Sequence, residues 1–326
     1  MNRSWITLIA LFFVLSACNH SDDKKTTLHL AHSLNTQHPV HLGMIRMGEL
    51  LDEYSKGKMS LKIYPNQQLG SEREALELVQ IGSIAMTKVS SGTIENFVPE
   101  LRVYNLPYLF RDDEHIDKVL NGEIGRELLL AGEDYFLRGL TYYDAGQRSF
   151  YTKDRPILTP DDLKGLKIRV MESQMAMNLV RGMDGSPTPI SWGELYTALQ
   201  QGVVDGAENN PPSYESSRHY EVAKYYSLDE HTMIPDMLII STMQWNKLNT
   251  QQQEWLQMAA DSSARYQRQI WAEAEEKALE VVRAAGVEVI YPDKQPFIDK
   301  TAPIYEQYKE SDPEFYQLIQ RIKNTH

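Results

Sequence analysis

Apolar–polar alternation and amphipathic helical spacing follow one another along the first half of the chain. Strand patterns occur at residues 27–31, 59–64 and 84–89, and helix patterns lie between them at residues 39–55 and 71–82. Ser71 and Glu74, three residues apart at the start of the second helix, have the signature of a capping box. This strand–helix rhythm favours a mostly parallel sheet with helices on both faces.

A second strand–helix unit begins near Arg148. It contains expected strands at residues 166–170 and 203–207 and expected helices at residues 173–182 and 191–201. The second strand leads directly into Asn209. The chain therefore repeats the α/β pattern in a second domain, which agrees with a length of 326 residues at roughly 100–200 residues per domain.

The last third of the chain has a different pattern. No proline or glycine interrupts residues 251–285, and Thr250 with Gln253 has the spacing of a capping box. A continuous helix over this stretch would be roughly 52 Å long at 1.5 Å per residue, which exceeds one small domain. We therefore expect a long helix that lies across both domains, followed by a strand at 287–291 and a helix at 312–323.

The N-terminus differs from the rest of the chain. Residues 5–15 are almost wholly apolar, but this run is shorter than the roughly 20 residues that span a bilayer, so it reads as the core of a signal peptide. Small residues then precede Cys18, the only cysteine, in a pattern that resembles the lipobox of bacterial lipoproteins. We expect a lipoprotein signal peptide at 1–17, a lipid-anchored tether at 18–26 and a periplasmic body. An ordinary signal peptide is the alternative.

Composition excludes several classes of protein. The formal net charge is -12 and no basic block occurs, which argues against nucleic-acid binding. One cysteine excludes a disulfide framework and paired-cysteine zinc or redox sites. With 42% hydrophobic and 24% charged residues, the chain has the composition of a folded globular protein.

Arg169 is the first candidate for ligand binding. It lies near the carboxyl end of the 166–170 strand, the edge at which open α/β sheets bind ligands. Its planar guanidinium matches a carboxylate with two parallel hydrogen bonds, which lysine cannot do. A structural salt bridge is the alternative. Asn209 holds the equivalent place in the next unit and can both donate and accept, whereas Asn210 before Pro211 also fits a helix cap.

Neither metal nor enzyme chemistry has a clear signature. His29, His32, His38 and His41 cluster early, but no acid or cysteine completes a familiar ligand spacing. No nucleophile elbow and no phosphate-binding glycine loop occurs in the sequence. We therefore expect no metal, no cofactor and no catalytic residues.

Five ordered motifs resemble one family, the substrate-binding proteins of TRAP transporters, known as the DctP family. They lie at residues 64–70, 165–170, 186–189, 194–200 and 204–209. The resemblance implies an α/β periplasmic binding protein of two lobes, joined by hinge strands and spanned by a long helix. It places residues 27–145 with 235–274 in the first lobe and 146–234 with 275–326 in the second. It also implies an organic carboxylate ligand and delivery to the membrane subunits of the transporter.

The resemblance assigns residues to the cleft between the lobes. Arg169 matches the arginine that grips the substrate carboxylate, Asn209 matches its supporting asparagine, and Arg148 matches a second arginine after a one-residue shift. Trp192 falls where sialic-acid binders have a phenylalanine, and Ser90 falls where they have an acid. The remaining expected cleft residues are Glu72, Glu172, His32 and Asn210.

The ligand expected from this set is a sugar acid. Glu72 and Glu172 would accept hydrogen bonds from hydroxyls, and the segments 206–214 and 230–232 look most like those of members that take hexuronates. A C4-dicarboxylate or a 2-oxo acid is the main alternative within the family. Two further alternatives are a periplasmic enzyme that acts on uronates, with Glu72 and Glu172 as its acid and base, and a ligand-free scaffold.

Overall fold

The computed structural model describes residues 25–326. The expected signal peptide at 1–17, the expected lipidation site Cys18 and most of the tether at 18–26 lie outside the described residues. No helix from residue 25 onward is long and apolar enough to cross a membrane.

The first of two sheets has the strand order β2-β1-β3-β10-β4. Its strands are β1 (Thr26–Ala31), β2 (Met59–Tyr64), β3 (Met86–Ser90), β4 (Leu137–Tyr143) and β10 (Asp236–Ser241). The β1 strand pairs in parallel with β2 and β3, but β10 runs antiparallel to both β3 and β4. The sheet is therefore mixed, not mostly parallel, because a strand from far along the chain inserts into it.

The second sheet has the order β11-β9-β5-β8-β6-β7. Its strands are β5 (Gln147–Thr152), β6 (Lys167–Val170), β7 (Ser186–Pro189), β8 (Gly206–Asn209), β9 (Tyr225–Met233) and β11 (Glu288–Ile290). The β5 strand is antiparallel to its neighbours β8 and β9. The sequence pattern predicts that Asn209 follows a strand at residues 203–207. In the structure Asn209 is instead the last residue of β8, because β8 begins three residues later than expected.

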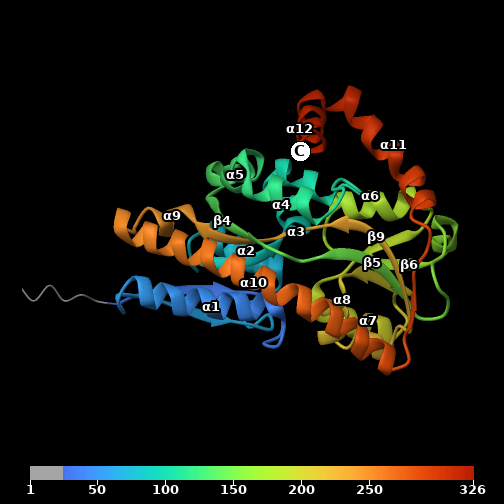
Figure 1. Cartoon of the computed structure of the whole chain (residues 1–326), viewed down its shortest axis with the longest axis horizontal. Helices are drawn as coiled ribbons and strands as arrows, with labels where there is room; N and C mark the ends of the chain where they lie inside the picture. The colour runs from blue at the N-terminus through green and yellow to red at the C-terminus, as the bar shows by residue number, and fades with distance from the viewer. Residues whose placement is uncertain (1–24) are drawn as a thin grey trace, which may run out of the picture.

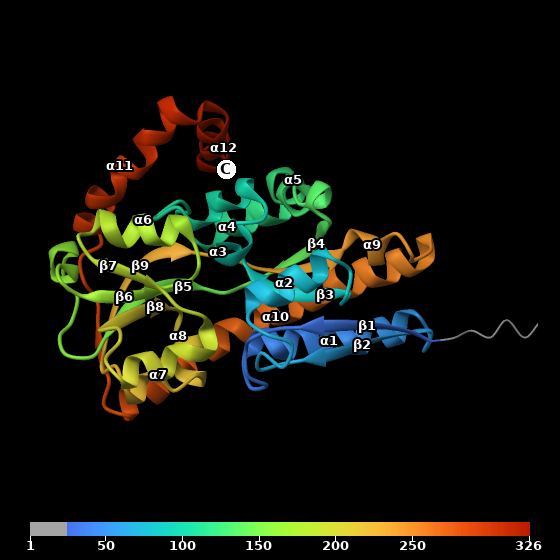
Figure 2. The ribbon, with the colours of Figure 1, turned by 180° about the vertical axis from the view of Figure 1, so that it is seen from behind.

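Two short crossings join the sheets. The chain leaves the first sheet after β4 and enters the second at β5 through residues 144–146, and it returns between β9 and β10 through residues 234–235. Two lobes result, one around each sheet, as the sequence predicts (Figures 1 and 2).

Helices cover both sheets. The α-helices before the long helix are α1 (Pro39–Tyr54), α2 (Glu72–Gln80), α3 (Ser91–Ile94), α4 (Asp113–Asn121), α5 (Glu123–Leu130), α6 (Gln174–Gly182), α7 (Leu195–Gln200), α8 (Pro211–Ser216) and α9 (Thr242–Trp245). The 3-10 turns are η1 (Pro99–Asn105), η2 (Glu133–Tyr135), η3 (Pro160–Leu163), η4 (Trp192–Glu194) and η5 (His219–Glu221).

The long helix α10 (Thr250–Ala284) is confirmed with 35 residues, and it contacts both lobes (Figure 1). Its capping box uses Asn249 and Gln252, not Thr250 and Gln253, because Asn249 has the extended backbone that a cap requires. The side chain of Gln267, in the middle of α10, donates to the carbonyl of Asp144 at 2.9 Å and accepts from the Asp144 amide at 2.8 Å. The long helix thus fixes the backbone of one crossing.

The chain ends in two helices, α11 (Gln295–Ser311) and α12 (Pro313–Lys323), of which the sequence predicts only the second. The α11 helix contacts the helix α6 and the strand β9 of the second lobe (Figure 2). The α12 helix contacts η1 of the first lobe. Arg102 in η1 forms an ion pair with Asp312 and lies over the ring of Phe315. The end of the chain therefore lies against the first lobe, although the sequence groups it with the second.

Candidate ligand-binding site

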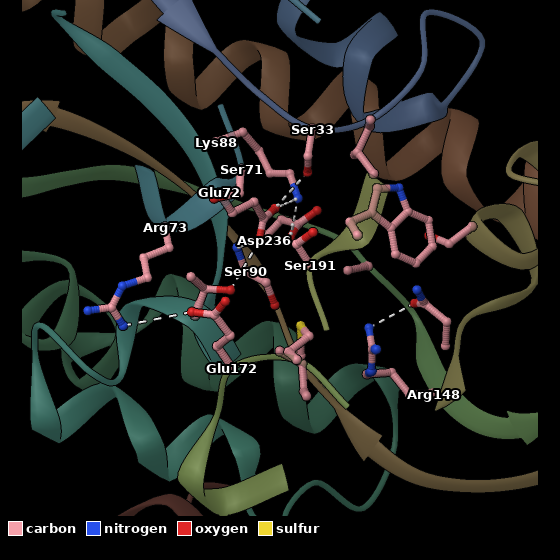
Figure 3. A pocket seen from close by; sticks show the side chains of 18 of the residues that line it. Ser33, Ser71, Glu72, Arg73, Lys88, Ser90, Arg148, Glu172, Ser191 and Asp236 are labelled. Carbon is pink, nitrogen blue, oxygen red and sulfur yellow. Dashed lines mark hydrogen bonds and ion pairs between the residues drawn. The ribbon is translucent and has the colours of Figure 1, made fainter. Parts of the chain in front are cut away.

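A cavity lies between the lobes, enclosing about 690 Å³ of space that is partly open to solvent. Residues from both sheets and from both crossings line it (Figure 3). Eight of the nine residues expected from the sequence are brought together here: Glu72, Ser90, Arg148, Arg169, Glu172, Trp192, Asn209 and Asn210. The ninth, His32, is not among the lining residues.

Arg169 stands on β6 with its side chain buried in the cavity wall. Its Nε donates to the carbonyl of Ile190 at 2.8 Å, which fixes the plane of the guanidinium. Its Nη1 is buried and has no hydrogen-bond partner among the described residues. Burial lowers the pKa of Arg169, since the charge is only weakly compensated. An unpaired, buried, charged donor favours an anionic ligand.

Arg148 on β5 has a different environment. It forms an ion pair with Glu208 through Nε, and its Nη2 donates to both the carboxylate and the carbonyl of Glu208 at 2.9 Å. Its Nη1 donates to Oδ1 of Asn209 at 2.8 Å. The sequence resemblance implies a second arginine on the ligand. Four of the five N–H donors of this guanidinium bond to protein groups, which leaves one N–H of Nη1 for that role. The guanidinium neutralises Glu208 and orients Asn209.

Behind this pair lies a second charged pair. His231 Nδ1 lies 2.8 Å from Asp229 and its Nε2 lies 3.7 Å from Glu208. Burial lowers the pKa of His231, but the two carboxylates outweigh burial and raise it to about 9. Burial would raise the pKa of Glu208, yet Arg148 and His231 lower it to about 2. Two cations therefore balance two anions on this side of the cavity.

The two asparagines differ in what they leave free. Asn209 Oδ1 accepts from Arg148 and from the Asn210 amide at 2.9 Å, which leaves its side-chain nitrogen to donate. Asn210 caps α8, accepting from the Ser213 amide at 2.8 Å and donating to the Ala145 carbonyl at 2.8 Å. Both ends of the Asn210 amide are used, which favours the helix-cap interpretation.

The wall from the first lobe contains a buried ion triad. Lys88 Nζ lies 2.7 Å from Oε1 of Glu72 and 3.0 Å from Oδ1 of Asp236, as Figure 3 shows. The three side chains are 4%, 14% and 8% exposed. Burial would raise the pKa of Glu72, but Lys88 lowers it, whereas burial raises the pKa of Asp236 despite Lys88.

Neutral polar groups surround Glu72. Its carboxylate accepts from the hydroxyls of Thr93 at 3.2 Å and Ser33 at 3.4 Å, and from the Ser90 amide at 3.4 Å. Ser90 also caps α3, where its hydroxyl accepts from the Gly92 amide at 3.4 Å. The capping box at Ser71 starts α2 at Glu72, so local sequence places this carboxylate at the cavity.

Glu172 and Trp192 complete the second-lobe wall. Glu172 lies 3.8 Å from Arg73 of the opposite lobe, and both side chains are more than 40% exposed, so this is a pair at the rim (Figure 3). Trp192 in η4 has its ring centroid 5.7 Å from the Arg169 guanidinium. An aromatic face beside a guanidinium suits a ligand that has a carboxylate next to a ring.

His32 lies behind the wall and not in it. Its Nδ1 accepts from the Leu34 amide at 3.1 Å and its Nε2 lies 2.9 Å from Nδ1 of His41. Burial first, and then the charges of His41 and Lys88, lower the pKa of His32 to about 2, so it is neutral. No group of three or more histidine, cysteine or acidic side chains in residues 25–326 is arranged to hold a metal ion.

Sequence reasoning missed Lys88 and Asp236. Lys88 is the single charged residue of β3, and Asp236 begins the otherwise uncharged β10; a charge within a strand is the available signal. The two strands pair antiparallel with Asp236 opposite Ser90, which brings together residues 148 positions apart. No local pattern indicates this pairing.

Comparisons with known proteins identify the family of this chain. The family model described as bacterial extracellular solute-binding protein, family 7 (DctP), matches residues 30–312. A TRAP periplasmic solute-binding protein from Xanthobacter autotrophicus, solved with bound β-D-galacturonate, is 40% identical, with a TM-score of 0.88 over 92% of this chain and 100% of that chain. One from Roseobacter denitrificans, with bound β-D-glucuronate, is 37% identical, with a TM-score of 0.89 over the same shares.

A curated relative supports the same assignment. The 2,3-diketo-L-gulonate-binding periplasmic protein YiaO of Escherichia coli is 31% identical over 89% of each chain. The fold, the interlobe cavity and these similarities all point to one family. The chain belongs to the DctP family and is a TRAP periplasmic solute-binding protein, a member of a family of binding proteins and not of enzymes.

Proposed function

We propose that this protein binds a hexuronate in the interlobe cavity, with the ligand carboxylate on Arg169. The observation that carries the proposal is the buried guanidinium of Arg169, whose Nη1 has no partner within residues 25–326. A ligand carboxylate would supply the missing acceptor and the missing negative charge. The galacturonate and glucuronate bound by similar proteins support this choice of ligand.

The rest of the cavity suits a hydroxylated ring. Carboxylate oxygens of Glu72 and Asp236 accept hydrogen bonds, the nitrogen of Asn209 donates, and Trp192 offers an apolar face. Sugar hydroxyls can serve both kinds of partner. A C4-dicarboxylate or a 2-oxo acid would use Arg169 but has fewer hydroxyl groups to donate to Oδ2 of Asp236, which accepts no hydrogen bond within residues 25–326, so it is the second candidate.

Arg169→Ala tests the carboxylate contact. We expect uronate affinity to fall at least about 100-fold, because a charge-assisted pair of hydrogen bonds is lost from a buried site. Isothermal titration calorimetry with D-galacturonate and D-glucuronate measures it, with succinate and pyruvate as competing ligand classes. Arg169→Lys is the matched control and should keep part of the affinity, since it retains the charge without the planar fork. Unchanged affinity in Arg169→Ala would contradict the proposal.

We further propose that ligand binding closes the lobes about the two crossings. The moving units would be residues 27–145 with 235–274 and residues 146–234 with 275–326, except that α12 packs against η1 and would stay with the first unit. Hinge closure around a ligand is a known means of presenting a loaded state. The membrane subunits of the transporter would recognise that closed form.

The lipid anchor at Cys18 is likewise proposed from the sequence. The small residues before Cys18 resemble a lipobox, and more than one acyl chain gives stable anchoring. Cys18→Ser should move the protein from the membrane fraction to the soluble periplasmic fraction. An equal distribution of both variants would argue for an ordinary signal peptide.

A further inference from the structure

We propose that Glu72, Lys88 and Asp236 form a charge filter, which admits sugar monocarboxylates and rejects the dicarboxylates with the same carbon skeleton. The inference rests on the proposed function, because it assumes that the ligand carboxylate lies on Arg169. It adds what the opposite wall selects.

The charges that line the cavity carry the argument. Lys88 contacts two carboxylates, at 2.7 Å and 3.0 Å, so this triad of the first-lobe wall has one carboxylate more than it has cations. At the rim, Arg73 lies 3.1 Å from Glu77 and 3.8 Å from Glu172, so its charge is already paired. The remaining polar groups of this wall, such as Ser33, Ser90 and Thr93, are neutral.

The second-lobe wall has the opposite balance. Arg148 is paired with Glu208, and His231 behind it is paired with Asp229, so these four groups compensate one another. Arg169 has no such carboxylate partner in the described chain. The cavity is therefore polarised, with a free cation on one wall and an excess carboxylate on the other.

This polarity distinguishes a uronate from an aldarate. A uronate has one carboxylate, and its hydroxyls can donate to Oδ2 of Asp236, which accepts no hydrogen bond within residues 25–326, and to Glu72 in exchange for Ser33 or Thr93. An aldarate has a second carboxylate in place of the aldehyde carbon, and that group has no proton to donate at neutral pH. Facing Glu72 and Asp236 in a buried site, it would meet like charges that water cannot screen.

Lys88 does not remove this repulsion. Its ammonium already donates to Glu72 and to Asp236, and its charge is more than balanced by theirs. Burial lowers the pKa of Lys88, but the two carboxylates outweigh it and raise the pKa, so the side chain stays charged and paired. Its role is to hold the two carboxylates in place as acceptors for hydroxyl groups.

Calorimetric titration of the full-length protein with matched ligand pairs tests the filter. The probes are D-galacturonate against galactarate and D-glucuronate against glucarate. For the wild type we expect the uronate to bind at least about 100-fold more tightly than its aldarate. Glu72→Gln and Asp236→Asn each remove the excess carboxylate and leave Lys88 one partner. Each should narrow this ratio at least about tenfold.

Glu49→Gln is the matched control, because it neutralises an exposed carboxylate of α1 that does not line the cavity. It should change the ratio by less than about threefold, since solvent screens exposed charges. Melting temperatures establish that each variant is folded, and two independent variants guard against the loss of one.

The outcomes separate the two proposals. Uronate binding with a ratio that both triad variants narrow supports the filter. A wild type that binds uronate and aldarate alike, or variants that lose both ligands equally, would overturn the filter and leave the uronate function standing. A wild type that binds no uronate overturns the proposed function itself, and the filter with it.

Discussion

At the scale of single residues, two buried arginines in one cavity have different roles because their partners differ. Arg169 donates to one backbone carbonyl, whereas Arg148 forms an ion pair with Glu208 and donates to Asn209. A buried charge without compensation favours binding, while a compensated one mainly keeps the wall in shape. The residue type alone does not distinguish them.

Arg148→Met should therefore destabilise the fold. Glu208 and Asp229 would be left to share one cation, His231, and we expect a loss of about 3–5 kcal/mol in the free energy of unfolding. Denaturant unfolding monitored by circular dichroism measures this loss. The double variant Arg148→Met with Glu208→Gln is the control and should recover part of the stability. If Arg148→Met were as stable as the wild type, the ion pair would not support the wall.

At the scale of elements, α10 and the first crossing form one packed unit. Gly146 in the crossing has φ +57, and a Cβ placed there would lie 2.7 Å from the Glu275 carboxylate and 2.9 Å from Nε1 of Trp271. Only glycine combines this backbone conformation with so close an approach. Burial, and then the charges of Asp144, Asp113 and Glu230, raise the pKa of Glu275 to about 7.

This packing predicts a pH dependence of stability. The folded state holds the proton of Glu275 more tightly than the unfolded state does, so stability is fully present below about pH 4.5 and falls as pH rises to about 7. Glu275→Gln should be more stable than the wild type at pH 8, by at most about 3 kcal/mol, and nearly equal to it at pH 4.5. Thermal unfolding at both pH values measures the difference. Parallel pH profiles for the two proteins would contradict this assignment.

At the scale of the whole molecule, two side chains of the first lobe form hydrogen bonds with α8 of the second lobe. His38 accepts from the Val40 amide through Nδ1, so Nε2 carries the proton and donates to Ser213 Oγ at 3.1 Å. Asn35 donates from Nδ2 to the Ser216 carbonyl at 3.0 Å. If the proposed opening of the lobes separates these groups, the two hydrogen bonds favour the closed form.

The variant Asn35→Asp tests whether these hydrogen bonds between the lobes stabilise the closed form. The variant keeps the acceptor that bonds to the amides of Gln37 and His38 but loses the donor to Ser216. We expect uronate affinity to weaken about 3- to 30-fold, mostly through faster dissociation. Stopped-flow fluorescence measures both rate constants. Asn121→Asp, the same change on the exposed face of α4, should leave both unchanged. Equal dissociation rates for Asn35→Asp and the wild type would contradict the claim that this hydrogen bond stabilises the closed form.

The sequence by itself determined those features that depend only on neighbouring residues. The capping box at Ser71, the uninterrupted helix over 250–284 and the position of Arg169 near a strand end could all be read from neighbouring residues. The order of the family motifs indicated the two lobes. These features depend on residues a few positions apart, whose preferences persist whatever the rest of the chain does.

Only the tertiary structure decided which charges meet. The pairing of Lys88 with Asp236 depends on β10 entering the first sheet antiparallel to β3, and the pairing of Arg148 with Glu208 depends on β5 running beside β8. The mixed sheets and the contact of α12 with the first lobe were missed for the same reason. Such contacts join residues far apart in sequence, and their register is fixed by the packing of whole sheets and not by any local preference.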